Sequence, residues 1–521
     1  MGTVPTLPDL LARSARWFPD AEAAVDSACR YTYAELQEKA ERMAGLYHEL
    51  GVRRGDRVAF LLFASPDHVV ALFGALHLGA LPVALHVRES PAVLAASLRR
   101  LSPRVLVYDD SLHPVVEALR TEVPGVTGYV RARSEFTGTD ANAGSPDPLI
   151  PDCLGRYPSG RPRARVQETD AAIIVLSSGT TDLPKGIVHT HRTLMESARG
   201  GLYLWGARPS DAIVNTMTTS FIGWYNLCLP FLNVGAKNVF LSRFDPRRFL
   251  QTLQAEHATI AFLVPTMWRM LLREELPTYD LSRIRLVGFA GEVMDAKTLL
   301  RVKQAFSDNV INIYGTTETG SCSGGTIMFA EDMAREGKLS SVGKPHLNSD
   351  VRIITPGGEP DAEVPRGEIG EVIVSGPSVA DDVWDDPEAA RRIFRERWWY
   401  SGDLGRLDGD GYLFLEGRAD DMIISGGINV LAVRFENVLM THEGVSEVAV
   451  VGRPDEVYGQ RVTAYVVAKG AEVTADALDA HVRASELSDY QRPRAYHFVT
   501  ALPRTASGKL NRRALRTGAG E

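Results

Sequence analysis

The sequence predicts an α/β protein, in which a large N-terminal domain of doubly wound sheets and helices is followed by a small α+β domain. The chain has 521 residues, which is too long for one compact core, so two or more domains are expected. Its first third alternates helical and strand-like patterns, and its last hundred or so residues carry a separate pattern. Repeated alternation of strands and helices is typical of a largely parallel sheet covered by helices.

The elements of the first third are short and regularly spaced. Residues 33–50 have apolar side chains at helical spacing up to Gly51, and the apolar run at 58–63 predicts a strand buried on both faces. Residues 66–79 predict a second helix, and residues 81–85 predict another short strand. Between residues 137 and 165 the pattern gives way to Gly, Pro, Ser and Asp, which predicts a surface loop. A strand is predicted again at 171–176.

The C-terminal hundred residues predict strands at 445–452 and 461–467 and a helix at 475–487. A linker is expected near residues 418–421. We therefore divide the chain into a large domain of residues 1–419 and a small domain of residues 420–521.

Composition excludes several classes of function. The formal net charge of -8 provides no broad basic face for a nucleic acid, so no nucleic-acid partner is expected. No run of about 18 apolar residues occurs, so no membrane span is expected, and the N-terminus does not resemble a signal peptide. The four cysteines form no CxxC pair, which argues against a zinc site or a disulfide framework and favours a cytoplasmic location.

The segment SSGTTDLPKG, at residues 177–186, directly follows the predicted strand at 171–176. A turn that leaves a buried strand exposes backbone N–H groups, and glycine permits close approach of a phosphate. Lys185 adds a cation suited to the β- and γ-phosphates of ATP. The segment is not a Walker A loop, because Gly186 follows the lysine. The residues alone leave two interpretations open, a phosphate loop and an ordinary polar turn.

This segment is similar to the signature [ST]SG[ST]TGxPKG of the adenylate-forming superfamily. That superfamily includes acyl-CoA synthetases, firefly luciferase and the adenylation domains of peptide synthetases. Asp182 stands where glycine is usual. The resemblance continues in order over roughly residues 8–513, and it implies that ATP is bound by Ser177, Ser178, Gly179, Thr180, Thr181 and Lys185.

Two further segments resemble nucleotide-binding motifs of this superfamily. GFAGE at 288–292 resembles the strand and loop that line the adenine pocket, which implicates Gly291 and Glu292. YGTTET at 314–319 matches the motif YGxTE. The resemblance implies that Tyr314 packs on adenine beside Gly315 and Thr316, that Thr317 holds the α-phosphate, and that Glu318 is a ligand of Mg²⁺. A carboxylate oxygen is a hard ligand that suits this ion.

The remaining motifs lie near the predicted domain boundary and the C-terminus. YSGD at 400–403 resembles YxTGD, in which the aspartate, here Asp403, accepts both ribose hydroxyls. GRADD at 417–421 resembles the family hinge, with Asp420 at the pivot and Arg418 near the nucleotide. PRTASGK at 503–509 is similar to PxTxSGKxxR, which makes Lys509 the catalytic lysine.

The resemblance implies a two-step reaction with ATP, Mg²⁺ and coenzyme A. A substrate carboxylate attacks the α-phosphate while Lys509 offsets the charge on the pentavalent centre. The mobile small domain then rotates, and a thiol attacks the acyl-adenylate near Gly426 and Gly427 of ISGGIN at 424–429. The sequence departs from the family next to this face: Arg434 replaces the first glutamate of PxEIE, and Gln460 stands where GE is common.

The substrate is expected to be a small-molecule carboxylic acid. Ile222 stands where relatives that activate amino acids carry an aspartate, so an α-amino acid is not expected. Phe221 replaces a histidine gate of many aryl and acyl ligases. We interpret the pocket as roomy and apolar, suited to a bulky acid, with these lining residues: Phe221, Trp224, Met267, Phe289, Gly315 and Gly320. In the alternative interpretation the aromatic residues are simply core and the glycines belong to a flexible loop.

Three functions remain open. The first is a complete acid–CoA ligase. The second is an adenylate-forming enzyme that passes the acyl group to a carrier protein in trans, or to another partner protein. The third is an adenylate-binding protein without catalysis, against which the presence of Lys509, Thr317, Glu318 and Asp403 argues.

Overall fold

The computed structural model divides the chain into two compact units, residues 1–351 with 374–400 (unit 1) and residues 352–373 with 401–521 (unit 2). The residues described are 6–137, 142, 144–160, 164–177, 184–291, 294–320, 325–346, 348–470, 473–485, 487, 491–505 and 510–518. The boundary predicted between residues 419 and 420 was placed at the expected hinge residue Asp420. The two units above are defined by compactness instead, so this boundary stays a prediction.

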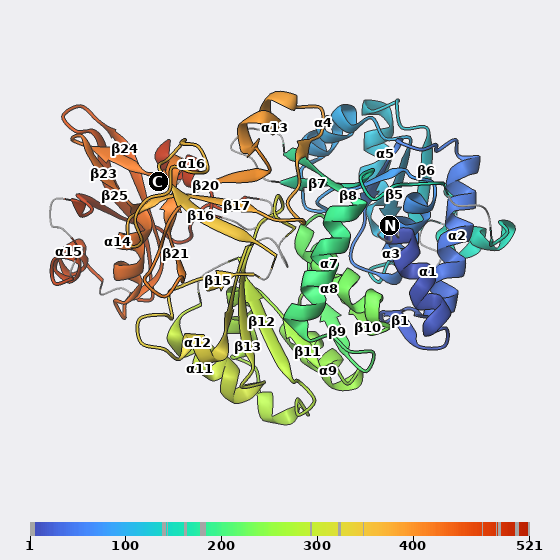
Figure 1. The fold of residues 1–521 in the computed structure, drawn as a ribbon, viewed down its shortest axis with the longest axis horizontal. Helices are drawn as coiled ribbons and strands as arrows, with labels where there is room; N and C mark the ends of the chain where they lie inside the picture. Colours follow the sequence, from blue (N-terminus) through green and yellow to red (C-terminus); the bar gives the residue numbers. More distant parts are fainter. Residues whose placement is uncertain are drawn as a thin grey trace. The chain divides into compact units, whose positions relative to one another are not determined.

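The first sheet of unit 1 has seven strands (Figure 1). In order across the sheet they are β18 (Asp382–Val383), β8 (Lys185–Thr190), β7 (Ala171–Ser177), β4 (Leu81–Ala84), β3 (Arg57–Leu61), β5 (Val105–Asp109) and β6 (Gly128–Ala132). The strands from β7 to β6 pair in parallel, while β8 and β18 are antiparallel to their neighbours. The predicted doubly wound arrangement is confirmed here.

Both faces of this sheet are covered, which explains its continuous apolar strands. Along β3, Val58 and Phe60 join one hydrophobic cluster, and Ala59 and Leu61 join another. The first cluster is closed by α2 (Tyr33–Glu49) and α3 (Pro66–His77), and the second by α4 (Pro91–Leu101) and α5 (His113–Glu122).

The second sheet of unit 1 has nine strands. Their order is β15 (Lys344–Pro345), β14 (Thr326–Phe329), β13 (Val310–Tyr314), β12 (Leu286–Ala290), β11 (Ile260–Phe262), β9 (Ala212–Asn215), β10 (Lys237–Phe240), β1 (Glu22–Val25) and β2 (Arg30–Thr32). On one face α9 (Pro246–Ala255), α10 (Pro265–Leu271) and α11 (Ala296–Ala305) close a hydrophobic cluster. The short helix α12 (Ala330–Met333) follows β14, and α13 (Pro387–Ile393) follows β18.

Two helices lie between the sheets and belong to the core of both. Helices α7 (His191–Trp205) and α8 (Ile222–Val234) pack side by side (Figure 1). Their residues Leu194 and Leu229 join the cluster of the first sheet, and Trp205 and Phe231 join that of the second. Helix α1 (Leu7–Trp17) packs on α8. Because they touch both sheets, α7 and α8 fix the positions of the loops that leave each sheet.

Unit 2 has its own core. Strands β24 (Val445–Asp455) and β25 (Gly459–Ala468) form a long antiparallel pair, and β26 (Ala495–Phe498) adds in parallel. Helices α14 (Ala432–Met440) and α15 (Ala475–Arg483) cover them, and α16 (Arg512–Arg516) lies against β24. Strands β21 (Leu413–Arg418), β22 (Ile423–Ser425) and β23 (Ile428–Val430) also belong to unit 2, whereas β19 (Phe394–Arg395) belongs to unit 1. Strands β16 (Asp350–Ile354), β17 (Gly370–Ser375) and β20 (Trp398–Leu407) each include residues of both units.

Most elements predicted from the sequence are confirmed, with shifts of a few residues at their ends. Helix α2 begins at the predicted residue because the side chain of Thr32 accepts a hydrogen bond from the backbone N–H of Glu35, whose carboxylate bonds back to Thr32. The helix predicted at 475–487 ends earlier, at Arg483.

The segment predicted as a surface loop, residues 137–165, contains two helical turns. They are α6 (Ile150–Cys153) and a 3₁₀ turn at Leu154–Arg156. These turns have too few residues for a helical period to be visible in the sequence, so the prediction of a surface loop did not include them.

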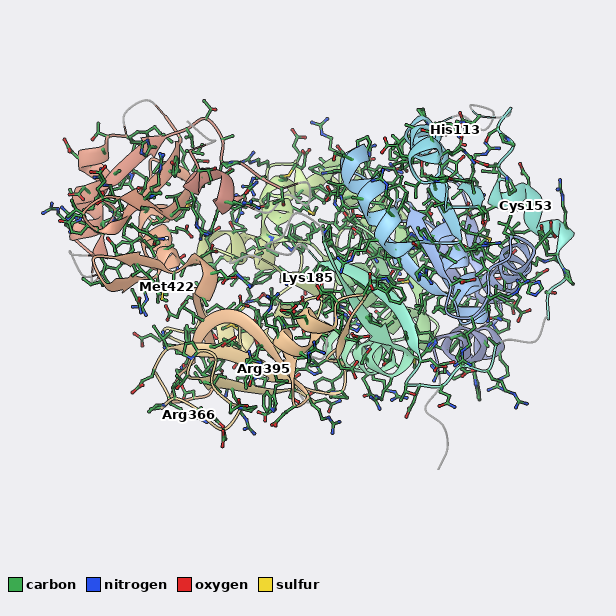
Figure 2. The ribbon with its side chains drawn as sticks, turned by 90° about the horizontal axis from the view of Figure 1, so that it is seen from above. His113, Cys153, Lys185, Arg366, Arg395 and Met422 are labelled. Atoms are coloured by element: carbon green, nitrogen blue, oxygen red, sulfur yellow. The ribbon has the colours of Figure 1, made fainter. Side chains whose placement is uncertain are left out.

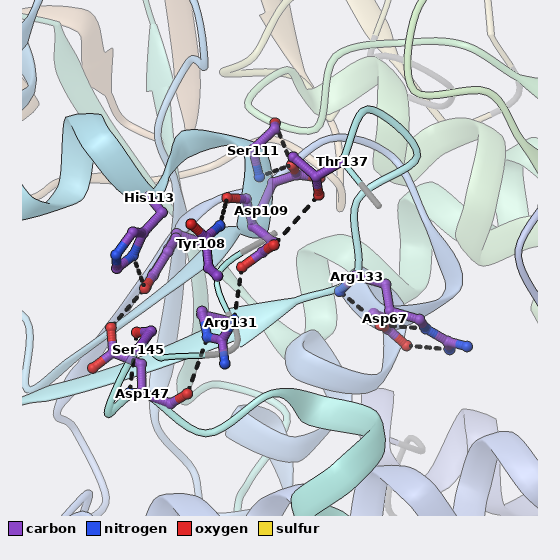
Figure 3. Close-up of polar contacts among 12 residues, drawn as sticks. Asp67, Tyr108, Asp109, Ser111, His113, Arg131, Arg133, Thr137, Ser145 and Asp147 are labelled. Carbon is purple, nitrogen blue, oxygen red and sulfur yellow. Dashed lines mark hydrogen bonds and ion pairs between the residues drawn. The ribbon is translucent and has the colours of Figure 1, made fainter. Parts of the chain in front are cut away.

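This segment is attached to the first sheet by buried polar contacts (Figure 3). Nε of Arg131 donates to the carbonyl oxygen of Asp147 at 3.0 Å, and Nη1 of Arg131 pairs with Oδ1 of Asp110 at 3.0 Å. The hydroxyl of Tyr108 donates to Oδ2 of Asp147 at 2.6 Å. Because a buried charge is stable only when paired and hydrogen-bonded, this network holds the loop at the ends of β5 and β6.

Among the helices of the described residues, none combines the length and the apolar character needed to cross a bilayer.

Three histidines of unit 1 are buried where solvation cannot stabilise their charged form. Burial lowers the pKa of His68 from the ordinary 6.5 to about 3, and the pKa values of His189 and His191 to about 4. These three side chains are therefore neutral in the folded protein at pH 7.

We expect the free energy of unfolding to fall as the pH is lowered from about 6.5 towards 4. In that window the unfolded chain binds protons at these histidines while the folded chain does not, and each costs up to about 1.4 kcal/mol per pH unit. Urea unfolding at several pH values measures the slope. His191→Gln should make this slope smaller by the contribution of one histidine. An unchanged slope in that variant would contradict the conclusion that His191 is neutral in the folded protein.

Candidate active site

The predicted phosphate loop starts and ends at two paired strand residues. Ser177, the last residue of β7, lies opposite Lys185, the first residue of β8, in an antiparallel register. The Lys185 side chain can be followed in Figure 2. Ser178, Gly179, Thr180 and Thr181, with the rest of residues 178–183, lie outside the described residues. The hairpin therefore brings the two ends of the predicted loop together.

The base of this hairpin is closely packed at Gly186. A Cβ atom there would lie 2.9 Å from Cγ2 of Ile174 and 3.0 Å from Cβ of Trp384, so no larger residue fits without a shift. The backbone N–H of Trp384 donates to the carbonyl of Gly186 at 2.7 Å, and Arg100 donates to the carbonyls of Pro184 and Trp384. These contacts fix the direction in which Lys185 leaves the sheet.

The second predicted ATP segment follows β13, of which Tyr314 is the last residue. Four consecutive carbonyl oxygens of this loop accept hydrogen bonds from other segments of unit 1. The donors are Nε2 of His189 to Thr317 at 2.8 Å, the N–H of Ala380 to Glu318 at 2.8 Å, Oγ of Ser378 to Thr319 at 2.8 Å, and Oγ of Ser197 to Gly320 at 2.5 Å. We call this set the carbonyl clamp.

The carbonyl clamp leaves the side chains of Thr317 and Glu318 partly exposed. Within the described part of the chain, no basic side chain pairs with the Glu318 carboxylate, and Oγ1 of Thr316 is buried without a hydrogen-bond partner. The hydroxyl of Thr319 is instead used inside the loop, where it accepts from the N–H of Thr316 at 3.0 Å. The loop backbone is thus fixed, while the side chains of Thr317 and Glu318 remain partly accessible to solvent.

The segments predicted at the adenine pocket leave neighbouring strands. Strand β12 pairs in parallel with β13, with Ala290 opposite Ile313, so the residues that follow both strands emerge at the same edge. Gly291 has φ +84°, a conformation that favours glycine. Glu292 lies outside the described residues. Gly291 therefore follows one strand of this edge, and Gly315 and Thr316 follow Tyr314 at the end of the neighbouring strand.

The predicted acid-pocket residues fall into two groups. Phe221, just before α8, is half-buried, and its ring centroid lies 5.6 Å from that of His86. Trp224 is fully buried, packed against His68, and Phe289 is 4% exposed within the cluster of the second sheet. The structure therefore places Trp224 and Phe289 in packed hydrophobic cores. Met267 is half-buried beside the same cluster as Phe289.

His86 was not predicted from the sequence. It follows β4 and lies in no recognisable motif, and only the fold brings it against Phe221. Desolvation, reinforced by Arg88, lowers the pKa of His86 from its ordinary value.

In unit 2 the two residues predicted to bind the nucleotide pair with each other. Asp403 on β20 lies opposite Arg418 at the end of β21, and Nη1 of Arg418 is 2.9 Å from Oδ1 of Asp403. Gly402 has φ +68°, and a Cβ there would lie 3.1 Å from Nη2 of Arg418. The glycine of YSGD thus allows the guanidinium to lie against the backbone next to Asp403.

The predicted hinge and thiol-access residues lie in consecutive turns of unit 2. Asp420 is in a 3₁₀ turn at Ala419–Asp421, and its carbonyl accepts from Arg516 at 3.1 Å. Gly426 and Gly427 have φ +60° and +80° and form the turn between β22 and β23. The glycines are needed here because both residues adopt the left-handed region.

The two departures from the family pattern are part of local contacts. Nε of Arg434 is 2.9 Å from Oε2 of Glu416, whose Oε1 also pairs with Arg406 at 2.9 Å. The amide oxygen of Gln460 accepts from the N–H of Ile424 at 2.8 Å. Sequence reasoning identified both substitutions but not their partners, which lie 18 and 36 residues away.

Lys509 lies outside the described residues, but the last residue of its motif is described. Arg512 forms two bonds with the Glu436 carboxylate, at 2.6 and 2.9 Å, and donates to the carbonyl of Val450 at 3.0 Å. This bidentate contact anchors the segment that follows Lys509 to α14 and β24.

A large doubly wound α/β unit together with a smaller unit that has its own α+β core is the architecture of adenylate-forming enzymes, whose solved structures share this fold. The chain belongs to the family of AMP-binding enzymes: the sequence model of that family matches residues 11–384, and the model of the AMP-binding enzyme C-terminal domain matches residues 434–509.

Curated relatives are similar over nearly the whole chain. A long-chain-fatty-acid–CoA ligase of Mycobacterium tuberculosis is 30% identical over 513 residues, which cover 97% of each chain. A feruloyl-CoA synthase of Amycolatopsis sp. is 32% identical over 504 residues, which cover 96% of each chain.

Solved structures share the fold. An anthranilate CoA ligase in complex with anthranoyl-AMP has a TM-score of 0.86 and 28% identity, covering 100% of this chain and 98% of its own. The amide bond synthetase of Marinactinospora thermotolerans has a TM-score of 0.85 and 27% identity, covering 98% of this chain and 100% of its own.

Substitution at Gly320 tests whether the loop geometry matters for ATP use. Gly320 has φ +69°, and an added Cβ would lie 3.0 Å from the carbonyl oxygen of Ser378. Gly337 has φ +73° but nothing within 4 Å of an added Cβ, which makes it a matched control. We expect Gly320→Ala and Gly337→Ala each to lose about 1–2 kcal/mol of stability, and only Gly320→Ala to raise the KM for MgATP. Equal KM values in both variants would contradict this.

Proposed function

We propose that the chain is an ATP-dependent ligase that activates a carboxylic acid as its acyl-adenylate and then transfers the acyl group to coenzyme A. The observation that carries the proposal is the 2.8 Å hydrogen bond from His189 to the carbonyl of Thr317. It joins β8, which begins at the end of the predicted phosphate loop, to the loop with Thr317 and Glu318. Two segments that hold phosphate oxygens and their metal must lie close together, and this bond supports that arrangement.

In the first step a carboxylate oxygen of the substrate attacks the α-phosphorus of ATP. The new P–O bond forms as the bond to the pyrophosphate leaving group breaks, so the charge is spread over phosphate oxygens. We assign Lys185 to the β- and γ-phosphates, Thr317 to the α-phosphate and Lys509 to the charge that develops at the reacting centre. These three residues would stabilise the charge of the transition state and would form no covalent bond with the substrate.

We assign Glu318 as a ligand of Mg²⁺. A metal ligand should not already be neutralised by a protein cation, and no basic side chain among the described residues pairs with this carboxylate. With Glu318 among its ligands, the ion would neutralise part of the charge on the phosphate oxygens. Asp403 and Arg418 are assigned to the ribose and the nucleotide, which requires Asp403 to exchange its Arg418 contact for the ribose hydroxyls.

In the second step the sulfur of coenzyme A attacks the acyl carbon. A thioester bond forms, the bond from the acyl carbon to the phosphate oxygen breaks, and AMP leaves with that oxygen. We assign Gly426 and Gly427 to the path of the thiol and Asp420 to the pivot between the two half-reactions.

A second candidate passes the acyl group to a carrier protein in trans or to another protein. It is supported by the substitutions at Arg434 and Gln460, because both lie in the segments assigned to thiol access. The product formed with and without coenzyme A separates the two candidates.

For the acid, we propose a bulky apolar or aromatic compound. Ile222 provides no carboxylate for an ammonium group, and Phe221 is half-buried with His86 beside it. Two relatives are named for aromatic acids, ferulate and anthranilate.

We expect acid-dependent pyrophosphate release with MgATP and an acyl-CoA product when coenzyme A is added. A panel of aryl, arylpropenoyl, long-chain and short-chain acids, followed by pyrophosphate assay and product mass, tests this. The bulky-acid proposal predicts the highest kcat/KM for aromatic or long acids. Far better use of short-chain acids would refute it, and an acyl-adenylate without a CoA ester would favour the second candidate.

Lys509→Ala should lower the rate of adenylation by about 10²–10³, because it removes a cation placed for the transition state. ATP binding should be retained, since this lysine acts on the reacting centre. Lys469→Ala changes an exposed lysine of the same unit and serves as the control. Unchanged pyrophosphate release in Lys509→Ala would remove this residue from the mechanism.

A further inference from the structure

His189 is the only side chain in the carbonyl clamp that comes from the phosphate-loop hairpin itself. It lies on β8, four residues after Lys185, and is fully buried. Its Nε2 lies 2.8 Å from the carbonyl oxygen of Thr317, and its Nδ1 lies 3.2 Å from Oγ1 of Thr193. The His189 ring therefore contacts the backbone of Thr317, the predicted ligand of the α-phosphate. The ring lies on β8, and this strand begins at Lys185, at the end of the predicted phosphate loop.

The partners of the ring fix its tautomer. A carbonyl oxygen can only accept, so Nε2 carries the proton and donates to Thr317. Nδ1 is then an acceptor, and the hydroxyl of Thr193 can donate to it. Burial lowers the pKa of His189 to about 4, so the ring stays neutral near pH 7. The ring is therefore a fixed donor that brings no net charge to a site that binds phosphates and Mg²⁺.

We propose that His189 is a positioning residue for adenylation, which holds the peptide between Thr317 and Glu318 in register with the phosphate loop. This proposal rests on the proposed function and deepens it. Thr317 and Glu318 adjoin the fixed carbonyl, so a displacement of that peptide moves the α-phosphate ligand and the metal ligand together. Of the four bonds in the carbonyl clamp, this one alone comes from the strand that begins at Lys185, so it ties the position of both residues to that strand.

A second buried histidine, directly after β8, serves as a control because its contact lies outside the predicted site. His191, two residues after His189, is also buried and neutral, but its Nδ1 accepts from the backbone N–H of Leu7 at 3.3 Å. His191 therefore anchors the N-terminal helix and does not contact the loop at 314–320. Substitutions at both positions separate loss of packing from loss of positioning.

The experiment compares His189→Gln with His189→Asn in the full-length protein. The amide nitrogen of glutamine can take the place of Nε2 and donate to Thr317, whereas asparagine is shorter and can replace only the Nδ1 contact. His191→Asn is the control. The readouts are the rate of acid-dependent pyrophosphate release against the concentration of free Mg²⁺, the KM for the acid, and the melting temperature.

We expect His189→Asn to lower the maximal rate and to raise the Mg²⁺ concentration for half-maximal rate, each by about tenfold, as for loss of one buried hydrogen bond. The KM for the acid should stay unchanged, and His189→Gln should recover most of the loss. His191→Asn should lower the melting temperature without changing the Mg²⁺ dependence. Equal Mg²⁺ dependence in His189→Asn, His189→Gln and wild type would show that His189 is only structural and overturn the proposal.

A binding measurement separates this proposal from the proposed function. Affinity for a non-hydrolysable ATP analogue is measured with Mg²⁺ and with a chelator in wild type and in each variant. If wild type binds the Mg²⁺ complex but releases no pyrophosphate, the proposed function fails, while a selective loss of the Mg²⁺-dependent affinity in His189→Asn still supports positioning by His189. If that affinity is unchanged in His189→Asn, the positioning role is refuted whatever the activity of wild type.

Discussion

The loop at residues 317–320 is held by hydrogen bonds to each of its backbone carbonyl groups. The four carbonyl groups of residues 317–320 are satisfied by β8, by α7 and by the segment at 378–380. Leaving buried carbonyls unsatisfied would cost on the order of 1–3 kcal/mol each, so the loop has few alternative conformations of similar energy. Thr317 and Glu318 can then be presented to a ligand without being used to hold the loop in place.

This arrangement explains why helices α7 and α8 matter for chemistry as well as for the core. They contribute to the hydrophobic clusters of both sheets. Oγ of Ser197 on α7 donates to the carbonyl of Gly320 and also lies 2.8 Å from the side-chain amide of Asn226 on α8. The phosphate-loop hairpin belongs to one sheet, and the loop after β13 belongs to the other. Two rigid sheets are thus joined through the helices packed between them, and the distance between their loops is set by the core.

The sequence predicted those elements that a short run of neighbouring residues, such as an apolar run or a motif, is enough to indicate. Apolar runs at 58–63 and 171–176 predicted buried strands. The motif residues Ser177, Lys185 and Tyr314 were found at strand ends, where ligands of α/β proteins bind. The partners of these motifs could not be predicted. His189 and Ser197 act on residues 128 and 123 positions away, and a single histidine or serine in a strand or helix carries no pattern that points to such a contact. The same holds for Arg131 and Asp147, whose contacts fix a segment that its composition predicted to be a surface loop.

The substitution at Arg434 illustrates how a departure from a family pattern can be accommodated. An arginine in place of a glutamate reverses the charge at the start of α14, and Glu416 on β21 compensates for it while also pairing with Arg406. Glu416 is largely buried, so two guanidinium groups are needed to offset the cost of removing its charge from water. Arg434 is therefore part of the connection between β21, which carries Arg418, and α14, which follows the glycine turn at Gly426 and Gly427. A residue that departs from the pattern thus supports the two segments assigned to the nucleotide and to the thiol, and its effect on the reaction would act through their positions rather than through direct contact with the acyl group.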